Sequence, residues 1–195
     1  MKKFFINVLV LFYLSFIIGN LALVHADYVL PYPSFMPGNK IYHVSRIMDT
    51  LKAYWYWGTI AEIKYHLSLS DKYLVEAKTL FEYKQYLLAT DALSRSDAAL
   101  SGISKLLDRG NEEGKDMSEQ KAIVVEAMKT HISTIENMRQ WLPNEFQWTP
   151  EKDAATDLSI GAMLDTSIQI RNTLLNALQD HIQQYTYIGS TIAPW

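Results

Sequence analysis

Residues Ile60–Leu107 read IAEIKYHLSLSDKYLVEAKTLFEYKQYLLATDALSRSDAALSGISKLL. Two runs of mostly apolar residues stand there, and each steps by three and four positions, the spacing that keeps side chains on one face of a helix. The segment between them, Glu82–Gln85, is short and polar. The stretch therefore predicts two helices that fold back on each other as an αα-hairpin. The runs are Ile60, Ile63, Leu67, Ser70, Leu74, Ala77 and Phe81, then Tyr86, Ala89, Leu93, Ser96, Leu100, Ile103 and Leu107.

The same periodicity predicts further helices on both sides of the hairpin. They span Lys40–Tyr56, capped by Asn39, then Glu119–Leu142, capped by Ser118, and finally Thr156–Gln184. The first of these carries Val44, Ile47, Leu51 and Tyr54 on the side that we expect to face the core. In the last helix Arg171 falls on the apolar stripe, and we expect it near the stripe's edge with its charge reaching water.

The apolar faces are wider than a two-stranded coiled coil requires, which favours a multi-helix bundle. The predicted fold is therefore all-α, a bundle of about five helices around the central hairpin. It forms one domain over residues 27–195. Three segments are expected to lie outside the helices: an N-terminal arm, Asp27–Lys40, extended by Pro31, Pro33 and Pro37; the connector Asn144–Ala154, packed on the bundle through Phe146 and Trp148; and the irregular C-terminal tail Tyr185–Trp195.

The N-terminus has the pattern of a secretory signal peptide. Lys2 and Lys3 precede an apolar run, Phe4–Val24, and small residues at Val24 and Ala26 fit a cleavage site after residue 26. The sequence thus predicts an extracytoplasmic protein, secreted or periplasmic. The alternative is an uncleaved membrane anchor, because the run is long enough to span a bilayer. Membrane attachment is expected only through residues 4–24.

Composition excludes several functional classes. Without Lys2 and Lys3, the 18 basic side chains become 16 against 21 acidic ones, a net charge of about −5. A nucleic-acid partner is not expected, because such binding rests on clustered positive charge. The chain has no cysteine, so it forms no disulfides and offers no thiol nucleophile.

No residue pattern indicates catalysis, a cofactor or a metal site. No glutamate stands three residues before a histidine of the 27–195 domain, as a di-iron bundle would require, and His131 is interpreted as a satisfied core histidine. The charged residues of the first hairpin helix, Asp71 and Glu76 among them, are expected to form a solvated face. We therefore expect a protein that is not an enzyme.

Exposed aromatic residues are the candidates for partner binding. Tyr54, Trp55, Tyr56 and Trp57 are consecutive and point around a whole helical turn, so one core face cannot hide them all. They either fill the junction with the next helix or form a partner-binding patch. The arm and the tail add three further candidates, Tyr32, Phe35 and Trp195.

The arm and the hairpin resemble an uncharacterised bacterial family, domain of unknown function 5667. The resemblance covers about Tyr28–Leu107 and rests on Leu30-Pro31-Tyr32-Pro33, Met36-Pro37-Gly38, the basic helix start Tyr42–Arg46, Ala61-Glu62 and the leucine-rich Leu67–Leu80. The chain departs from the family pattern at Ala53–Trp57, where aromatic residues replace a more polar helix end. The resemblance implies an exported or membrane-attached helical domain, and it supplies no catalytic residues.

The leading functional hypothesis is a non-enzymatic module that binds a protein partner at the bacterial cell envelope. One alternative is a structural protein anchored by residues 4–24. Another is a small-ligand-binding bundle, which would require polar groups such as Ser70, Ser96 and His131 to converge in the core.

Overall fold

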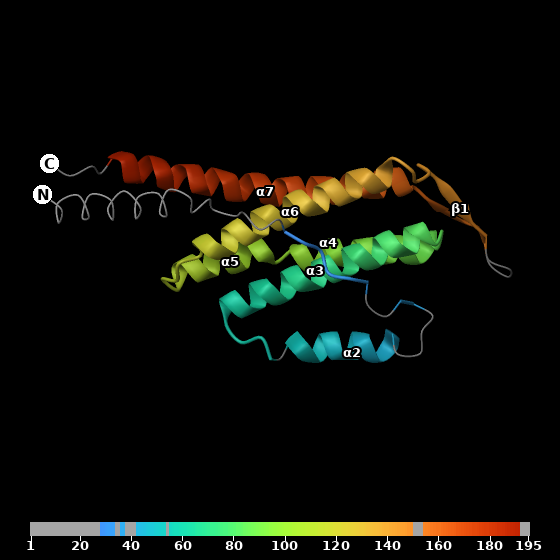
Figure 1. Ribbon diagram of the computed structural model, residues 1–195, viewed down its shortest axis with the longest axis horizontal. Helices are drawn as coiled ribbons and strands as arrows, with labels where there is room; N and C mark the ends of the chain where they lie inside the picture. Colours follow the sequence, from blue (N-terminus) through green and yellow to red (C-terminus); the bar gives the residue numbers. More distant parts are fainter. Residues whose placement is uncertain (1–27, 34–35, 38–41, 54, 150–153, 192–195) are drawn as a thin grey trace, which may run out of the picture.

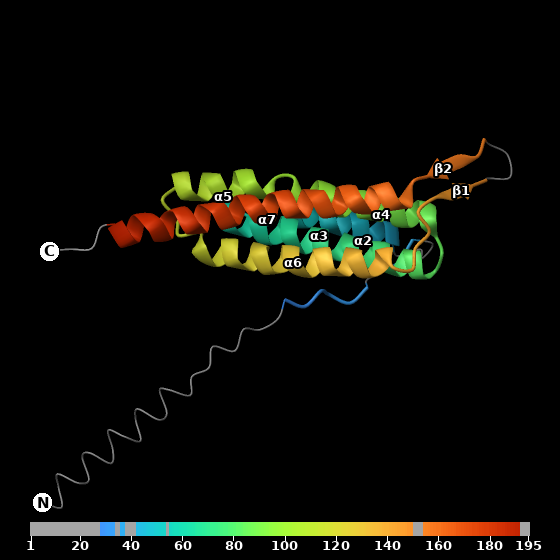
Figure 2. The ribbon, with the colours of Figure 1, turned by 90° about the horizontal axis from the view of Figure 1, so that it is seen from above.

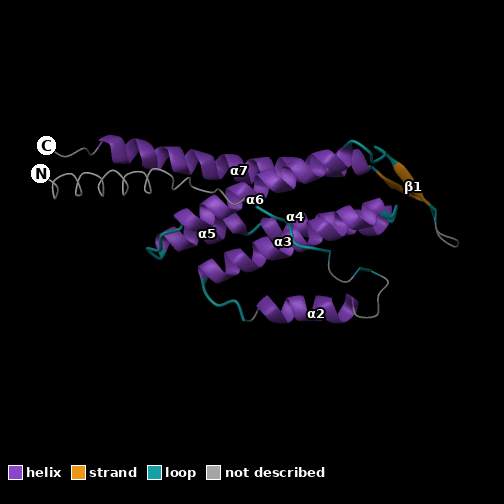
Figure 3. Cartoon of the chain, viewed as in Figure 1, coloured by secondary structure: helices purple, strands orange, loops and turns teal. Residues whose placement is uncertain are grey.

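The structure, a computed structural model, describes residues 28–33, 36–37, 42–53, 55–149 and 154–191. This part of the chain is mostly helical, which confirms the predicted all-α bundle (Figures 1 and 3). The two short strands lie beyond one end of the helices. The elements are α2 (Tyr42–Ala53), α3 (Thr59–Glu82), α4 (Tyr86–Leu100), α5 (Ile103–Glu112), α6 (Ser118–Arg139), β1 (Phe146–Trp148), β2 (Thr156–Leu158) and α7 (Ile160–Thr191).

Helices α3 and α4 form the predicted central hairpin, with Tyr83, Lys84 and Gln85 as the turn. Gln85 N–H donates to Leu80 O and Lys84 N–H to Phe81 O, both at 2.9 Å. These two bonds make a Schellman ending, whose turn residue adopts the left-handed conformation. Lys84 has φ 59° there, a position where glycine is usual.

The periodicity predicted a single helix for the second arm of the hairpin, and this prediction is wrong. The arm breaks at Ser101–Gly102, and α5 then continues along α3. Helix α5 extends to Glu112, so the glycine at position 110 lies inside it. Gly110 is buried there against Met117, and a Cβ at this position would lie 2.5 Å from the Met117 Sδ.

Helices α6 and α7 form a second hairpin, joined through the β1–β2 ribbon. The predicted connector is not a loop throughout, since Phe146, Gln147 and Trp148 pair antiparallel with Leu158, Asp157 and Thr156. Phe146 packs against the core, as expected for this connector. Helix α6 begins at Ser118, one residue before the predicted start, and Met117 takes the N-cap position, so the predicted Ser118 cap is wrong. The Asp116 carboxylate accepts a 2.9 Å hydrogen bond from the Ser118 N–H at this end of the helix. Asn39, the cap predicted for the first helix, lies outside the described residues.

The predicted irregular tail is wrong over most of its length. Helix α7 starts at Ile160 instead of Thr156, and its backbone stays helical through Tyr185 to Thr191. No proline interrupts this stretch before Pro194, and Gly189 costs a helix interior only about 1 kcal/mol. Residues 192–195 lie outside the described part of the chain.

The bundle core consists of two apolar clusters separated by a polar layer. Leu67 and Met128 belong to the cluster near α5, and Leu74 and Ile135 belong to the cluster near the β ribbon. Between them each of the four long helices contributes buried polar side chains. This layer comprises Ser70 and Asp71 of α3, Ser96 and Asp97 of α4, His131 of α6, and Ser167 and Arg171 of α7.

Two segments pack on the outside of the bundle. Residues 28–33 lie over α3 and α6, where Leu30 packs against the core and the Thr130 hydroxyl donates to Tyr28 O at 3.4 Å. Figure 2 shows this segment on the α6 side of the molecule and α4 on the opposite side. Helix α2 lies against α3, apart from α6 and α7 (Figure 1).

Candidate functional site

Helix α2 turns its apolar side away from the bundle. Val44, Ile47 and Leu51, predicted to face the core, are 56%, 60% and 50% exposed. Met48 shares this side and is 42% exposed. The four side chains span about a quarter of the helical circumference, at the 3–4 spacing of an amphipathic helix. The prediction of a core-facing seam is therefore wrong for this helix.

Polar contacts explain the orientation of α2. The Tyr42 hydroxyl donates to Glu76 Oε1 at 2.7 Å, and the Tyr65 hydroxyl donates to Asp49 O at 2.8 Å. Lys72 forms an ion pair with Asp49. Because hydrogen bonds and an ion pair hold the polar side of α2 against α3, the apolar side is left in solvent. Glu76 is buried in this contact, so its predicted place on a solvated face is wrong.

The predicted aromatic candidates divide into exposed and partly packed residues. Trp55 and Trp57, directly after α2, are 80% and 85% exposed, and Tyr32 is 96% exposed. Tyr56 is 37% exposed, and its ring lies 5.3 Å from that of Tyr65. Tyr54, Phe35 and Trp195 lie outside the described residues. We call Val44, Ile47, Met48, Leu51, Trp55 and Trp57 together the α2 surface.

Arg171 is the centre of the polar layer. It is fully buried, so its predicted place at a stripe edge is wrong. Its Nη1 donates to Asp97 Oδ1 at 2.5 Å and to the Ser167 hydroxyl at 2.6 Å, and its Nη2 donates to the Ser96 hydroxyl at 2.8 Å. Burial lowers the pKa of Arg171, while the charge of Asp97 raises it. The guanidinium stays charged because its pKa starts so high.

His131 joins Arg171 to the opposite side of the bundle. Arg171 Nε donates to His131 Nδ1 at 3.3 Å, which leaves Nε2 to carry the proton and donate to Asp71 Oδ1 at 2.7 Å. Burial lowers the pKa of His131 below its usual value, and Arg171 lowers it further, against the opposing effect of Asp71. The imidazole is therefore neutral at pH 7, in agreement with its interpretation as a satisfied core histidine.

The layer ends at Tyr28 on one side. The Tyr28 hydroxyl donates to Asp71 Oδ2 at 2.6 Å, and burial together with this bond raises the pKa of Tyr28. Asp71 is thus a buried acceptor, and its predicted place on a solvated face is wrong. A continuous chain of hydrogen bonds runs from Tyr28 through Asp71, His131 and Arg171 to Asp97.

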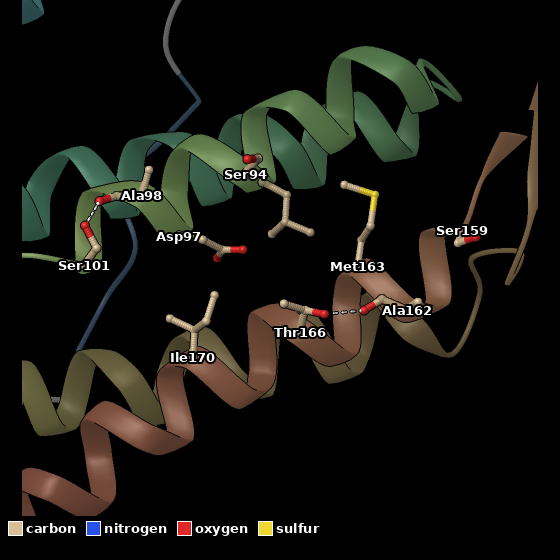
Figure 4. A pocket seen from close by; sticks show the side chains of 10 residues that line it. Ser94, Asp97, Ala98, Ser101, Ser159, Ala162, Met163, Thr166 and Ile170 are labelled. Carbon is tan, nitrogen blue, oxygen red and sulfur yellow. Dashed lines mark hydrogen bonds between the residues drawn. The ribbon is translucent and has the colours of Figure 1, made fainter. Parts of the chain in front are cut away.

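A groove opens at the Asp97 end of this chain, between α4 and α7 (Figure 4). Its volume is about 530 Å³. Asp97 points into the space between the two helices in Figure 4, with Ile170 and Met163 of α7 facing it. The remaining lining is small or apolar: Leu93, Ser94 and Ala98 from α4, Ser101 directly after α4, and Ser159, Ala162 and Thr166 near or on α7.

The described residues were also compared with the requirements of a metal site and of a membrane-spanning helix. In that part of the chain, no group of three or more His, Asp or Glu side chains could hold a metal ion. Likewise, none of its helices combines the length and the apolar character required to cross a bilayer. The predicted anchor, residues 4–24, lies outside this part.

The polar layer had a signal in the sequence. Ser70, Ser96, His131 and Arg171 each interrupt an apolar seam near the middle of a long helix. Polar residues at the same level of several helices meet in a bundle core. Asp71, Asp97 and Ser167 gave no such signal, because an acid or a serine beside a seam is usually solvated.

Comparison with protein-family models, with curated proteins and with solved structures found no match for this chain. The resemblance of Tyr28–Leu107 to domain of unknown function 5667 therefore stays a prediction. Two features remain on which a function can be based: the α2 surface, and the polar layer with its open groove.

Proposed function

We propose that this protein is an exported, non-enzymatic helical module that binds an amphipathic helix of a partner protein at the bacterial cell envelope. The observation that carries the proposal is the outward orientation of α2, which leaves Val44, Ile47 and Leu51 at least half exposed. Soluble proteins rarely expose contiguous apolar side chains without a binding role. Export itself rests on the signal-peptide pattern of residues 1–26.

The shape of the α2 surface favours a helix as its partner. Val44, Ile47, Met48 and Leu51 make a narrow stripe, four residues spaced as one helix face. A stripe of this width suits packing against one other helix. Trp55 and Trp57 at its end are the residue type that most often dominates interface energies.

The polar side of α2 argues against a lipid surface as the partner. Helices that lie in a bilayer interface flank their apolar face with rows of lysine and arginine. In α2 the opposite side carries one exposed basic residue, Arg46, and otherwise Tyr42, Ser45 and Asp49, which contact α3. Lys52, half exposed, is the basic residue that borders the stripe, so we expect an acidic residue opposite it on the partner.

Site-specific photo-cross-linking in the source cell tests the proposal. A photoreactive residue replaces Leu51 in one variant and Leu88 in the control variant, because Leu88 is also exposed but lies on α4. We expect a protein adduct from position 51 alone. Its cross-linked peptide should map to a helix with apolar residues at 3–4 spacing and an acidic border.

Two substitutions on α2 test the roles of the Lys52 charge and of the apolar stripe. Lys52→Glu and Ile47→Ser should each weaken the adduct, while circular dichroism should show an unchanged fold because both side chains are exposed. An adduct with lipid or with a second copy of this chain would contradict the proposal. So would equal cross-linking from positions 51 and 88, or no protein adduct at all.

A further inference from the structure

We propose that the groove between α4 and α7 binds an extended peptide segment of a partner, with a tyrosine hydroxyl of that segment donating a hydrogen bond to Asp97. This site is separate from the α2 surface and does not depend on the function proposed for that surface. Its support is the way in which the chain fills the corresponding groove on the other side of its own bundle.

The two hairpins of the bundle meet along two grooves, one between α3 and α6 and the other between α4 and α7. The chain's own extended segment, residues 28–33, lies over the first groove. Tyr28 inserts its ring against the core there and donates its hydroxyl to Asp71 Oδ2 at 2.6 Å. An aromatic hydroxyl on a proline-rich extended segment is thus the occupant that this fold already accepts.

The second groove repeats the elements that hold Tyr28. Asp97 follows Ser96 on α4 as Asp71 follows Ser70 on α3, and the two serine hydroxyls lie 3.0 Å apart in the polar layer. Each aspartate has one oxygen bound within the layer: Asp71 Oδ1 accepts from His131, and Asp97 Oδ1 accepts from Arg171 and Ser167. The other oxygen of Asp71, Oδ2, accepts the hydrogen bond from the Tyr28 hydroxyl.

The second carboxylate oxygen of Asp97, Oδ2, can still accept a hydrogen bond. Among the described residues, no side chain donates a hydrogen bond to Asp97 Oδ2, and the Asp97 side chain is 16% exposed. Because Arg171 already balances the carboxylate charge, a neutral donor suits this oxygen better than a second cation. The apolar lining from Leu93, Met163 and Ile170 suits the ring that would carry the hydroxyl.

The dimensions and the other polar groups of the groove also fit a peptide. A volume of about 530 Å³ lies within the range of ligand sites. The Ser101 and Thr166 hydroxyls each donate to a backbone carbonyl earlier in the chain, at 2.8 Å to Ala98 O and 2.9 Å to Ala162 O. Their lone pairs remain for the N–H groups of an extended backbone.

The test uses a free peptide with the sequence of residues 27–33, Asp-Tyr-Val-Leu-Pro-Tyr-Pro, and the ¹⁵N-labelled protein. We expect the peptide to shift the amide resonances of Ala98, Ala162 and Thr166. Replacing the first tyrosine of the peptide by phenylalanine should weaken its binding about tenfold or more, since a hydrogen bond to a charged group is lost.

A matched pair of protein variants locates the site. Ala98→Phe fills the groove from an exposed position on α4 and should abolish the shifts, whereas Ala122→Phe, at an exposed position on α6, should leave them unchanged. Shifts confined to Val75 and Thr134 would show that the peptide displaces residues 28–33, and would overturn the proposal. Equal binding of the phenylalanine peptide, or no shift at millimolar peptide, would overturn it as well.

Discussion

Replacing Arg171 by methionine removes a buried cation from the polar layer and leaves Asp97 without its balancing charge. The side chain of Arg171 is fully buried and that of Asp97 is 16% exposed, so water compensates little for the loss. Breaking a buried ion pair from one side costs about 3–5 kcal/mol of unfolding free energy. A domain has only about 5–15 kcal/mol in total. We therefore expect R171M to lose about a fifth or more of its unfolding free energy.

Urea unfolding followed by circular dichroism measures this loss, with a fall in melting temperature of about 6–20 °C as its thermal counterpart. Arg139→Met is the matched control, because Arg139 pairs with Asp165 at the surface and both side chains are about half exposed. It should cost about 1 kcal/mol or less. Adding Asp97→Asn to R171M should recover about 1 kcal/mol or more, since the unpaired charge is gone. Equal losses in R171M and R139M, or no recovery in the double variant, would refute this account of the layer.

Two further predictions concern pH and turn geometry. Burial lowers the pKa of His131 in the folded state, so the unfolded state binds the proton first as the pH falls below about 6.5. The unfolding free energy should therefore decrease there by up to about 1.4 kcal/mol per pH unit. In urea titrations at pH 7.5, 6 and 5, His131→Gln should show a shallower decrease. Parallel pH curves for the two proteins would exclude this role. Gly110→Ala should lower the unfolding free energy by about 1–3 kcal/mol, because the added Cβ would press on Met117. Gly102 has open space around it, so Gly102→Ala should be neutral or stabilising by up to about 1 kcal/mol. Similar shifts in melting temperature for both variants would count against the packing described at Gly110.

Periodicity predicted the parts of the fold in which apolar residues decide the packing. The hairpin α3–α4 and helix α6 follow their 3–4 patterns closely, because each pattern marks a face that the bundle core buries. The interpretation of His131 as a satisfied core residue also agrees with the structure, since both its ring nitrogens have partners.

The remaining features depend on contacts between segments distant in sequence. An apolar stripe such as Val44–Leu51 predicts an amphipathic helix but does not say which side of the helix will pack on the bundle. In α2 the polar side packs there, because Tyr42 bonds to Glu76 and Asp49 pairs with Lys72. Arg171 on an apolar stripe suggests an exposed edge until its partner Asp97, 74 residues away, is known. The β1–β2 ribbon was missed because strands of three residues carry almost no periodic signal.

The polar layer also bears on how the helices are aligned along one another. In a purely apolar bundle, a helix displaced by one turn, about 5.4 Å, exchanges one leucine contact for another at little cost. The same displacement of α7 would carry Arg171 away from Asp97 and into an apolar cluster, where an unpaired charge costs several kcal/mol. The layer thus acts as a register mark. We expect a bundle with apolar residues at every position of the layer, Asp71 and Asp97 included, to be equally stable or more stable, yet to populate several alignments instead of one.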